Sequence, residues 1–519
     1  MRRRAVASGG KDSDTYRMRE PDRLARPDAS SAAPRQTPRF AILLALLLVL
    51  FALVAAWTNP LFRPHRVTID LNTFYCAGMV VDRRADPYRA EPLGACERRA
   101  MAPPLPHIRP GVVMPAPLPP YALAPFALLA LLPYSLAIAL WSGAILAAAG
   151  ATVFAMRRLT GLSTAVLLAA FVLGTLVGLE LGQVAPIATA AVALSAYFAS
   201  RGKGSLAAIA ASCGMIEPHV ALPACLALFI WLPKTRVALA SAGAFCLALS
   251  LAFVGPPVAL EYLREVLPGH ALAEVNNHQQ LSLTYVLHRL GAAPALAVHA
   301  GEWWYGVMLV LGLTAAGRFA RHKPELVPSL PVAFAVFGGA FVHAVQTPAA
   351  LPAALILLAD TRTQASRRLP AIAVIFLALP FIQFFGLGPA ATVLYGAVAL
   401  ILAATLLETP PLPSLAFAFA AAAVPFGLWT ALQFPAIPSF APLVSAYDPH
   451  AIAEVSWMRY TDLLSTNAPF EIDIAKLPTW FALASILAMA AKRSRGDLTA
   501  RRARLPGVDT ALRYSRETP

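Results

Sequence analysis

The residues AILLALLLVLFALVAA, at positions 41–56, decide the fold class of this chain. Eleven of them are Leu, Ile, Val or Phe, and none is charged. At about −0.3 to −0.6 kcal/mol for each such side chain, insertion into a bilayer is favourable by roughly 3–7 kcal/mol. With its flanks the stretch covers Phe40–Trp57, close to the length of a membrane-spanning helix. The sequence therefore begins its apolar part with a predicted transmembrane helix.

The rest of the 519 residues continue this pattern. Hydrophobic residues make up 58% of the chain and charged residues only 13%, whereas soluble domains carry about 25% charged residues. The predicted fold class is an all-α polytopic membrane protein with roughly 11–14 transmembrane helices and large extracytoplasmic loops. Further spans are predicted near residues 134–156, 162–180, 184–200, 204–217, 219–233, 237–255, 303–319, 327–345, 348–360, 369–385, 388–407, 414–432 and 479–491.

Polar stretches divide these spans. Residues 58–117, 256–302 and 434–478 are predicted to be outer loops. Residues 118–132 are apolar, short and flanked by Pro, and they predict a re-entrant or interfacial helix. A transmembrane domain is expected over residues 40–491.

The net charge of +15 is concentrated at the two ends of the chain. Residues 1–39 hold ten Lys and Arg against five Asp and Glu, and residues 492–519 hold eight against three. Because basic residues favour the cytoplasmic side, both tails are predicted to be cytoplasmic, the first of them disordered. The charge is interpreted as a topology signal with contacts to membrane lipids, not as a nucleic-acid interface. The expected location is the cell (inner) membrane.

Cysteines predict one disulfide. Cys76 and Cys96 share the first outer loop, where an oxidising compartment permits a bond between them; two free thiols are the alternative. The other three cysteines lie in apolar helices and are expected to be packing residues. No Cys/His spacing typical of a metal site is present, and no metal is predicted.

Asp70 is the leading candidate for chemistry. It lies about a dozen residues beyond the first span, so its carboxylate is expected near the membrane surface. There it could take a proton from an acceptor hydroxyl as a general base, while Phe74 and Tyr75 pack against a sugar. The alternative is a structural role as a helix N-cap. The spacing alone leaves both possibilities open.

A resemblance to a known family extends this interpretation. The runs Asp70–Tyr75, Ala77-Gly78 and Asp86-Pro87-Tyr88 resemble the D-F-x-x-Y-Y…G-x-x-P-Y signature of glycosyltransferase family 87. The block Pro119-Pro120-Tyr121, Pro125-Phe126, Leu132-Pro133 and Leu140-Trp141 is also similar to the family, as are Gly182-Gln183 and Asn277–Ser282 with Arg289. The resemblance covers about residues 65–360. It implies a GT-C fold that transfers sugars, often mannose, from polyprenyl-phosphate donors on the outer face, with Asp70 as the catalytic residue.

Two segments depart from the family pattern. Glu217-Pro218-His219 stands where the family often has Lys-Pro, and Thr347-Pro348-Ala349 stands where it often has Ser-Pro followed by Trp or His. These departures affect the expected donor identity and phosphate contacts. His343 could take the place of the family residue that is missing after Pro348, or it could be a histidine hydrogen-bonded between helices.

The second outer loop gathers hydrogen-bond donors that suit a sugar and a phosphate. Arg289 is the predicted phosphate contact, with His219 or His278 beside it; a solvated loop with a snorkelling Arg289 is the alternative. The full set of predicted substrate-binding residues is Tyr75, Tyr88, Gln183, His219, Asn277, His278, Ser282, Arg289 and His343.

The predicted function is transfer of a hexose from a polyprenyl-phosphate donor to a lipid or glycan acceptor on the extracytoplasmic face. Asp70 takes the acceptor proton, and an inverting reaction is expected because phosphate leaves without needing a general acid. No DxD-like pair marks a metal-bound nucleotide sugar, and no cofactor is expected. The alternative is a polytopic transporter or lipid flippase, for which charged residues near the midplane and paired broken helices would be typical.

Overall fold

The computed structural model describes Leu46, Leu48–Leu50 and residues 68–100, 112–361, 363–386, 389–407, 448–465 and 471–503. These residues form helices and no strand, apart from two isolated β-bridges. The fold class is therefore all-α, as predicted. Most of the predicted spans at 40–57 and 414–432, both chain ends and parts of the first and third polar stretches lie outside the described residues.

Among the described residues, six helices are long and apolar enough to cross a membrane, by length and composition, and seven shorter apolar stretches accompany them. The chain is a polytopic membrane protein, while the predicted count of 11–14 spans stays a prediction. The principal helices are α2 (Ile69–Asp82), α3 (Ala90–Ala100), α4 (Ala124–Ala130), α5 (Tyr134–Thr160), α6 (Thr164–Leu181), α7 (Ala185–Ser200), α8 (Gly204–Cys213), α9 (Pro218–Trp231), α10 (Arg236–Glu261), α11 (Leu267–Ala273), α12 (Leu283–Arg289), α13 (Pro294–Phe319), α14 (Leu326–Gly338), α15 (Leu351–Ala359), α16 (Gln364–Ala378), α17 (Pro389–Leu407), α19 (Ala453–Ser465) and α20 (Glu471–Ala503).

The apolar helices pack through small residues. The largest buried cluster among the described residues joins α6, α7, α14, α15 and α16, and 19 of its 53 buried residues are alanines. Small side chains let helix backbones approach closely, which is how helices associate in a membrane without a hydrophobic driving force. Gly312 shows this, since a Cβ there would lie 2.9 Å from the Pro331 Cα on the neighbouring helix.

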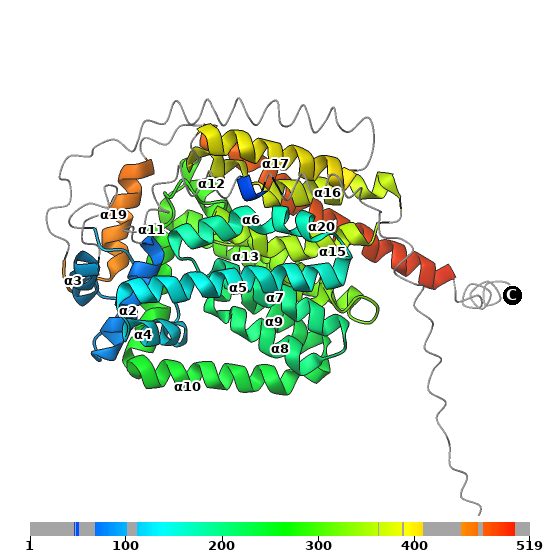
Figure 1. Cartoon of the computed structure of the whole chain (residues 1–519). Helices are drawn as coiled ribbons and strands as arrows, with labels where there is room; N and C mark the ends of the chain where they lie inside the picture. Colours follow the sequence, from blue (N-terminus) through cyan, green and yellow to red (C-terminus); the bar gives the residue numbers. More distant parts are fainter. Residues whose placement is uncertain are drawn as a thin grey trace, which may run out of the picture. The chain divides into compact units, whose positions relative to one another are not determined.

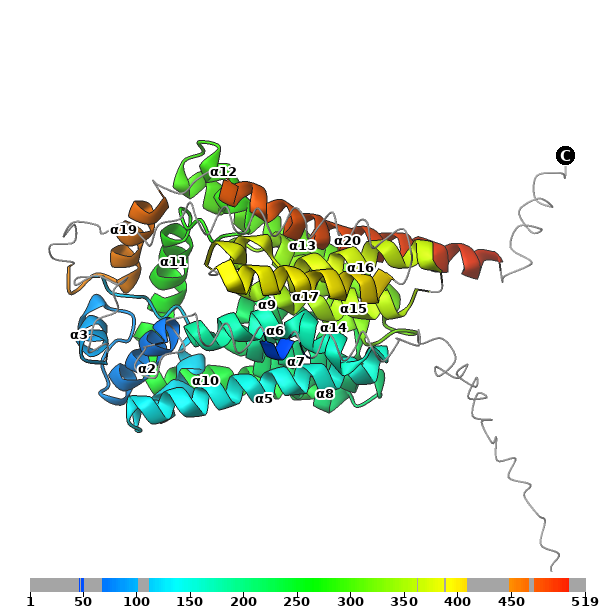
Figure 2. The same ribbon diagram turned by 45° about the horizontal axis from the view of Figure 1, so that its top comes forward.

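Helices α2, α3, α11 and α19 gather at one end of the helical bundle (left in Figures 1 and 2). The hairpins of the bundle alternate between this end and the other. Helix α5 starts here at Tyr134 and ends at Arg157 and Arg158, and α6 returns to Gly182. Arg201, Lys203, Lys234 and Arg318 likewise follow or end helices that run away from this end. The basic loops therefore lie opposite the end that carries the predicted site.

The second polar stretch is more helical than a loop. Helix α10 continues to Glu261, a π-helix covers Tyr262–Val266, and α11 follows directly. Gly255, at φ +77°, changes the backbone direction inside α10, so Pro256 and Pro257 start a new helical segment where they were expected to end one. Helix α13 also begins earlier than predicted, at Pro294. The third stretch contains α19 and the start of α20.

The predicted interfacial helix at 118–132 is present as a 3₁₀ turn, Pro120–Leu123, followed by α4. It packs against α2 at Gly78, where a Cβ would lie 2.4 Å from the Phe126 carbonyl carbon. The Phe74 and Phe126 rings meet at 5.1 Å, and Phe126 in turn packs on Trp141 at 4.8 Å. Helix α2 is thereby fixed against the membrane-spanning α5.

Candidate active site

Asp70 lies in the first turn of α2. Thr68 is the N-cap residue, and its side chain makes no capping bond, so the N-cap role considered for Asp70 is wrong. The Asp70 carboxylate instead accepts a hydrogen bond from the Gln183 side-chain amide. The helix dipole also favours a negative charge in this turn. Asp70 keeps part of its surface exposed and can therefore meet a substrate.

Gly182 explains why Gln183 reaches Asp70. It ends α6 with φ +75°, a conformation that L side chains adopt only with strain. A Cβ at Gly182 would lie 2.5 Å from the Cβ of Leu71, the residue after Asp70. The Trp141 indole N–H also donates to the Gly182 carbonyl at 2.8 Å. The Gly182-Gln183 pair is thus a close contact between the end of α6 and the start of α2.

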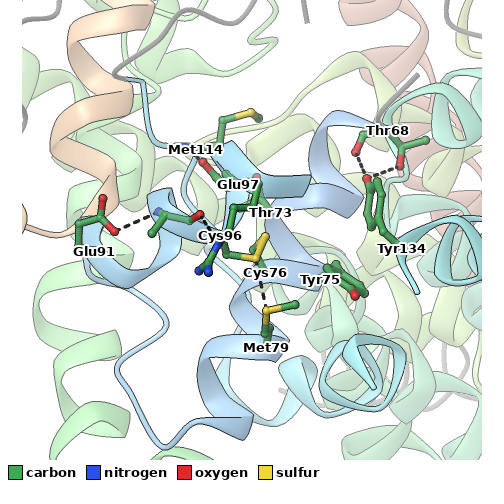
Figure 3. Close-up of a disulfide and its surroundings, with 12 residues drawn as sticks. Thr68, Thr73, Tyr75, Cys76, Met79, Glu91, Cys96, Glu97, Met114 and Tyr134 are labelled. Atoms are coloured by element: carbon green, nitrogen blue, oxygen red, sulfur yellow. Dashed lines mark hydrogen bonds between the residues drawn. A yellow bond between two sulfur atoms is a disulfide. The ribbon is translucent and has the colours of Figure 1, made fainter. Parts of the chain in front are cut away.

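A disulfide and a buried carboxyl hold the segment around α2 together (Figure 3). Cys76 on α2 is bonded to Cys96 on α3, which is the predicted pair. Next to it, Glu97 accepts hydrogen bonds from the Thr73 hydroxyl at 3.0 Å and from the Met114 N–H at 3.2 Å. Glu97 is 1% exposed, so α2, α3 and the chain at Met114 meet at one buried group.

Glu97 predicts a pH-dependent stability. Burial raises its pKa from 4.5 to about 8, partly opposed by the two hydrogen bonds that it accepts. Between these values the folded protein holds a proton that the unfolded chain has released, so stability falls as the pH rises through this window. We expect Glu97→Gln, which keeps the size of the side chain, to remove this part of the fall. Thermal melting of both proteins at pH 5 and pH 8 checks it.

The control for this measurement is Glu302→Gln, at a side chain that is 52% exposed. It should melt in parallel with the wild type at both pH values. A difference between Glu97→Gln and wild type that is the same at pH 5 and pH 8 would contradict the assignment.

A second polar cluster lies beside Asp70, between α11 and the turn at His343. Glu274 lies 3.3 Å from the His343 imidazole, which also contacts the Gln280 side-chain amide at 3.1 Å. Glu274 additionally accepts from Asn277 at 2.8 Å and from the Trp457 indole at 2.6 Å. The Glu274 side chain is 4% exposed and that of His343 25%, so the imidazole lies above a buried carboxylate.

Electrostatics tie this cluster to Asp70. Burial raises the pKa of Asp70 from 3.8 to about 7, while Gln183 and the His343 charge lower it and Glu274 raises it. Burial alone would raise the pKa of Glu274, but His343 brings it well below its ordinary value. His343 is affected in the opposite direction: burial lowers its pKa, and Glu274 and Asp70 more than compensate. A carboxyl that titrates near neutrality therefore lies within the field of a histidine held in its charged form.

Glu217, in the first segment that departs from the family pattern, contacts Gln346, which directly precedes the second. The Gln346 side-chain amide donates to Glu217 at 2.6 Å. The side-chain carbonyl of Gln346 in turn accepts from the backbone N–H of His343 at 2.8 Å. His219 lies 3.7 Å from Glu217. Glu217, His219 and His343 are thus parts of one site, although His343 lies more than a hundred residues further along the chain.

Three predicted substrate contacts have internal structural roles, which corrects the sequence interpretation. Tyr75 is 6% exposed and its hydroxyl donates to the Leu132 carbonyl at 2.8 Å. Tyr88 is 1% exposed and donates to the Leu118 carbonyl at 2.8 Å. Ser282, also 1% exposed, caps α12. Buried hydroxyls need a hydrogen-bond partner, and here the chain itself provides it.

The other predicted residues are divided between two places. Asn277 supports Glu274, as described above. His278 is half-buried near α20; burial and, to a smaller extent, the Lys476 charge lower its pKa from 6.5 to about 4. Arg289 lies on α12 and pairs with Asp473 of α20 at 3.2 Å, with a side chain that is 42% exposed. The predicted contact of Arg289 with a phosphate stays a prediction.

Sequence reasoning missed Glu274, Gln346 and Trp457. Glu274 is an ordinary charge in a polar stretch until its three hydrogen-bond donors are seen around it. Trp457 belongs to α19, far along the chain, and nothing in the sequence around it indicates that its indole donates to Glu274. These residues form the layer beneath the exposed surface of the site, and only the tertiary structure brings them together.

Comparison with known families agrees with the architecture and the site. Apolar helices of membrane-spanning length, with a cluster of carboxylates, amides and imidazoles at one end of the bundle, suit a membrane enzyme. Residues 118–348 match the model of glycosyltransferase family 87. The protein is a membrane glycosyltransferase, and the resemblance noted in the sequence is confirmed. No curated protein and no solved structure matches the chain.

The matched region includes Gln183, Glu217, Glu274 and His343. Asp70 precedes it, and α19 and α20 follow it. The site therefore also includes residues that precede and follow the region matched by the family model.

Proposed function

We propose that the protein transfers a hexose from a polyprenyl-phosphate donor to a lipid or glycan acceptor on the extracytoplasmic face of the cell (inner) membrane. The observation that carries this proposal is Asp70: a partly exposed residue whose carboxyl has its pKa raised to about 7 by burial, accepts a hydrogen bond from Gln183 and interacts electrostatically with His343. A general base is most effective when its pKa lies near the working pH. Asp70 therefore has the accessibility and the proton affinity that activation of an acceptor hydroxyl requires.

The proposed reaction is a single displacement. The acceptor oxygen attacks the anomeric carbon and its proton passes to Asp70. The bond between the anomeric carbon and the phosphate oxygen breaks, and polyprenyl phosphate leaves with the electron pair. The configuration at the anomeric carbon inverts. A phosphate leaves as a stabilised anion, so no acid needs to protonate it, and the reaction is proposed to need neither a metal nor a cofactor.

His343 is the proposed contact for the departing phosphate. Glu274 fixes its imidazole and favours the charged form. A charged imidazole stabilises the negative charge that develops on the leaving oxygen, and such charge-assisted contacts are stronger than neutral ones. His278 and Arg289 are further candidates on the side of α12 and α20.

The basic loops support the proposed orientation. They lie at the end of the bundle opposite the site, and basic loops favour the cytoplasmic side. The site would then face outward, with both termini in the cytoplasm.

The experiment is a transfer assay with purified protein in lipid nanodiscs. Polyprenyl-phosphate mannose is supplied with a lipid extract from membranes of the source cells, and release of polyprenyl phosphate is measured with and without the extract. Acceptor-dependent release is expected. Movement of the sugar lipid across the bilayer without any release would show a flippase instead. Lipid and glycan profiling of a strain that lacks the protein identifies the missing product.

A further inference from the structure

Glu217 occupies a corner of the site that the mechanism above does not use. Its side chain precedes α9 and is almost fully buried. One carboxyl oxygen, Oε1, accepts from Gln346, whereas Oε2 is buried and has no hydrogen-bond partner among the residues that the structure describes. An unsatisfied buried polar group costs about 1–3 kcal/mol, and more when it is charged. Such an oxygen indicates a donor that comes from outside the chain.

Two histidines border the same corner. The His219 Nε2 atom lies 3.7 Å from the Glu217 carboxylate, beyond a hydrogen bond, and the His270 Nδ1 atom is buried without a partner. Phe341 lies between the two imidazoles, at 5.1 Å from the His219 ring and 5.3 Å from the His270 ring. The His219 side chain is 25% exposed, so the corner is open to a ligand on that side.

The corner adjoins the reaction centre. Gln346 bridges it to His343, because its amide donates to Glu217 while its carbonyl accepts from the His343 N–H. The His343 imidazole lies within the electrostatic influence of both Asp70 and Glu217. A ligand held at Glu217 would therefore extend toward the carboxylate proposed to act as the base.

The chemistry of the corner selects its ligand. A carboxylate oxygen accepts hydrogen bonds and repels phosphate, and imidazole nitrogens can donate to or accept from hydroxyls. We propose that Glu217, with His219 and His270, forms a subsite for the ring hydroxyls of a neutral sugar, and that Glu217 determines sugar specificity. This inference rests on the proposed function, and the sugar can belong to the donor or to the acceptor.

The test compares wild type with Glu217→Gln, which keeps the shape and removes the charge and one acceptor oxygen. Both proteins are titrated with polyprenyl-phosphate mannose, glucose and galactose and with sugar-free polyprenyl phosphate. If the donor sugar occupies the subsite, the variant should bind the best sugar lipid roughly 10- to 100-fold more weakly, as expected for a hydrogen bond to a charged group. Its affinity for sugar-free polyprenyl phosphate should be unchanged or higher.

A second arm measures turnover at varied dilutions of the membrane lipid extract. If the acceptor sugar occupies the subsite, donor affinity stays constant and the KM for the acceptor rises by a similar factor. The control is Glu302→Gln, on α13, at a side chain that is 52% exposed and lies outside the site. It should change neither quantity.

The outcomes separate the two levels of the proposal. If wild type binds none of the sugar lipids, the proposed function is wrong and the subsite with it. If wild type prefers a sugar lipid and Glu217→Gln matches it in both arms, only the subsite is wrong. Equal weakening for sugar-free polyprenyl phosphate, or a ligand-free melting temperature well below wild type, would show a structural role for Glu217 and overturn the inference.

Discussion

Asp70→Asn should lower the rate of sugar transfer by roughly 10²- to 10⁴-fold, the usual contribution of a general base. The amide keeps the size of the side chain and can still pair with Gln183, but it cannot take the acceptor proton. Donor binding should change little, because the loss affects the transition state and not the ground state. The measurement is single-turnover transfer from polyprenyl-phosphate mannose, combined with a titration of donor affinity.

Asp82→Asn is the matched control. Asp82 ends the same helix, α2, and is exposed. Its replacement leaves the site untouched, so transfer should stay at the wild-type rate. Near-normal transfer by Asp70→Asn would overturn the proposed mechanism.

The pH dependence of the wild type belongs to the same prediction. Since the Asp70 pKa is about 7, the reactive carboxylate form grows as the pH rises through 7, and the transfer rate should rise with it. Stability should change in the opposite direction, because the folded state disfavours the charge that the unfolded chain carries above pH 3.8. Asp70→Asn should therefore gain stability relative to wild type as the pH is raised from 5 to 8, while losing activity.

Gly182→Ala should destabilise the protein by about 2–5 kcal/mol and reduce transfer by the molecules that remain folded. A left-handed conformation costs a non-glycine residue about 1–2 kcal/mol, and forcing an extra carbon into a packed site costs about 1–3 kcal/mol. The added Cβ would lie 2.5 Å from the Leu71 Cβ, so the start of α2 must shift. Asp70 would then move away from Gln183. Thermal melting and transfer assays measure the two effects.

Gly202→Ala separates the two causes. Gly202 also has a positive φ, +69°, but a Cβ there meets nothing within 4 Å. It should show only the cost of the backbone conformation, about 1–2 kcal/mol, with normal transfer. If both variants melt at the same temperature, the close approach of α6 to α2 is not important for stability.

The site is built from contacts between residues that are distant in sequence. Glu274 receives its donors from the next polar turn and from Trp457, and Glu217 receives its donor from Gln346. No spacing rule predicts such pairs, because each helix end is placed by the packing of the whole helix. The same reason explains the errors at Tyr75 and Tyr88. The sequence placed both tyrosines in a motif that resembles a sugar-binding pattern, but it did not indicate that their side chains are buried in the interior.

The sequence by itself determined the fold class, the membrane environment, the disulfide pair and the family. Each of these depends on local composition or on a short motif, and apolar length alone decides whether a helix can cross a bilayer. Only the tertiary structure decided which polar residues meet. It joined Asp70 to Gln183, placed His343 above Glu274 and left one oxygen of Glu217 without a partner. The physical reason is that helices carry their end residues as rigid bodies, so a site built from six helix ends exists only once those helices have packed.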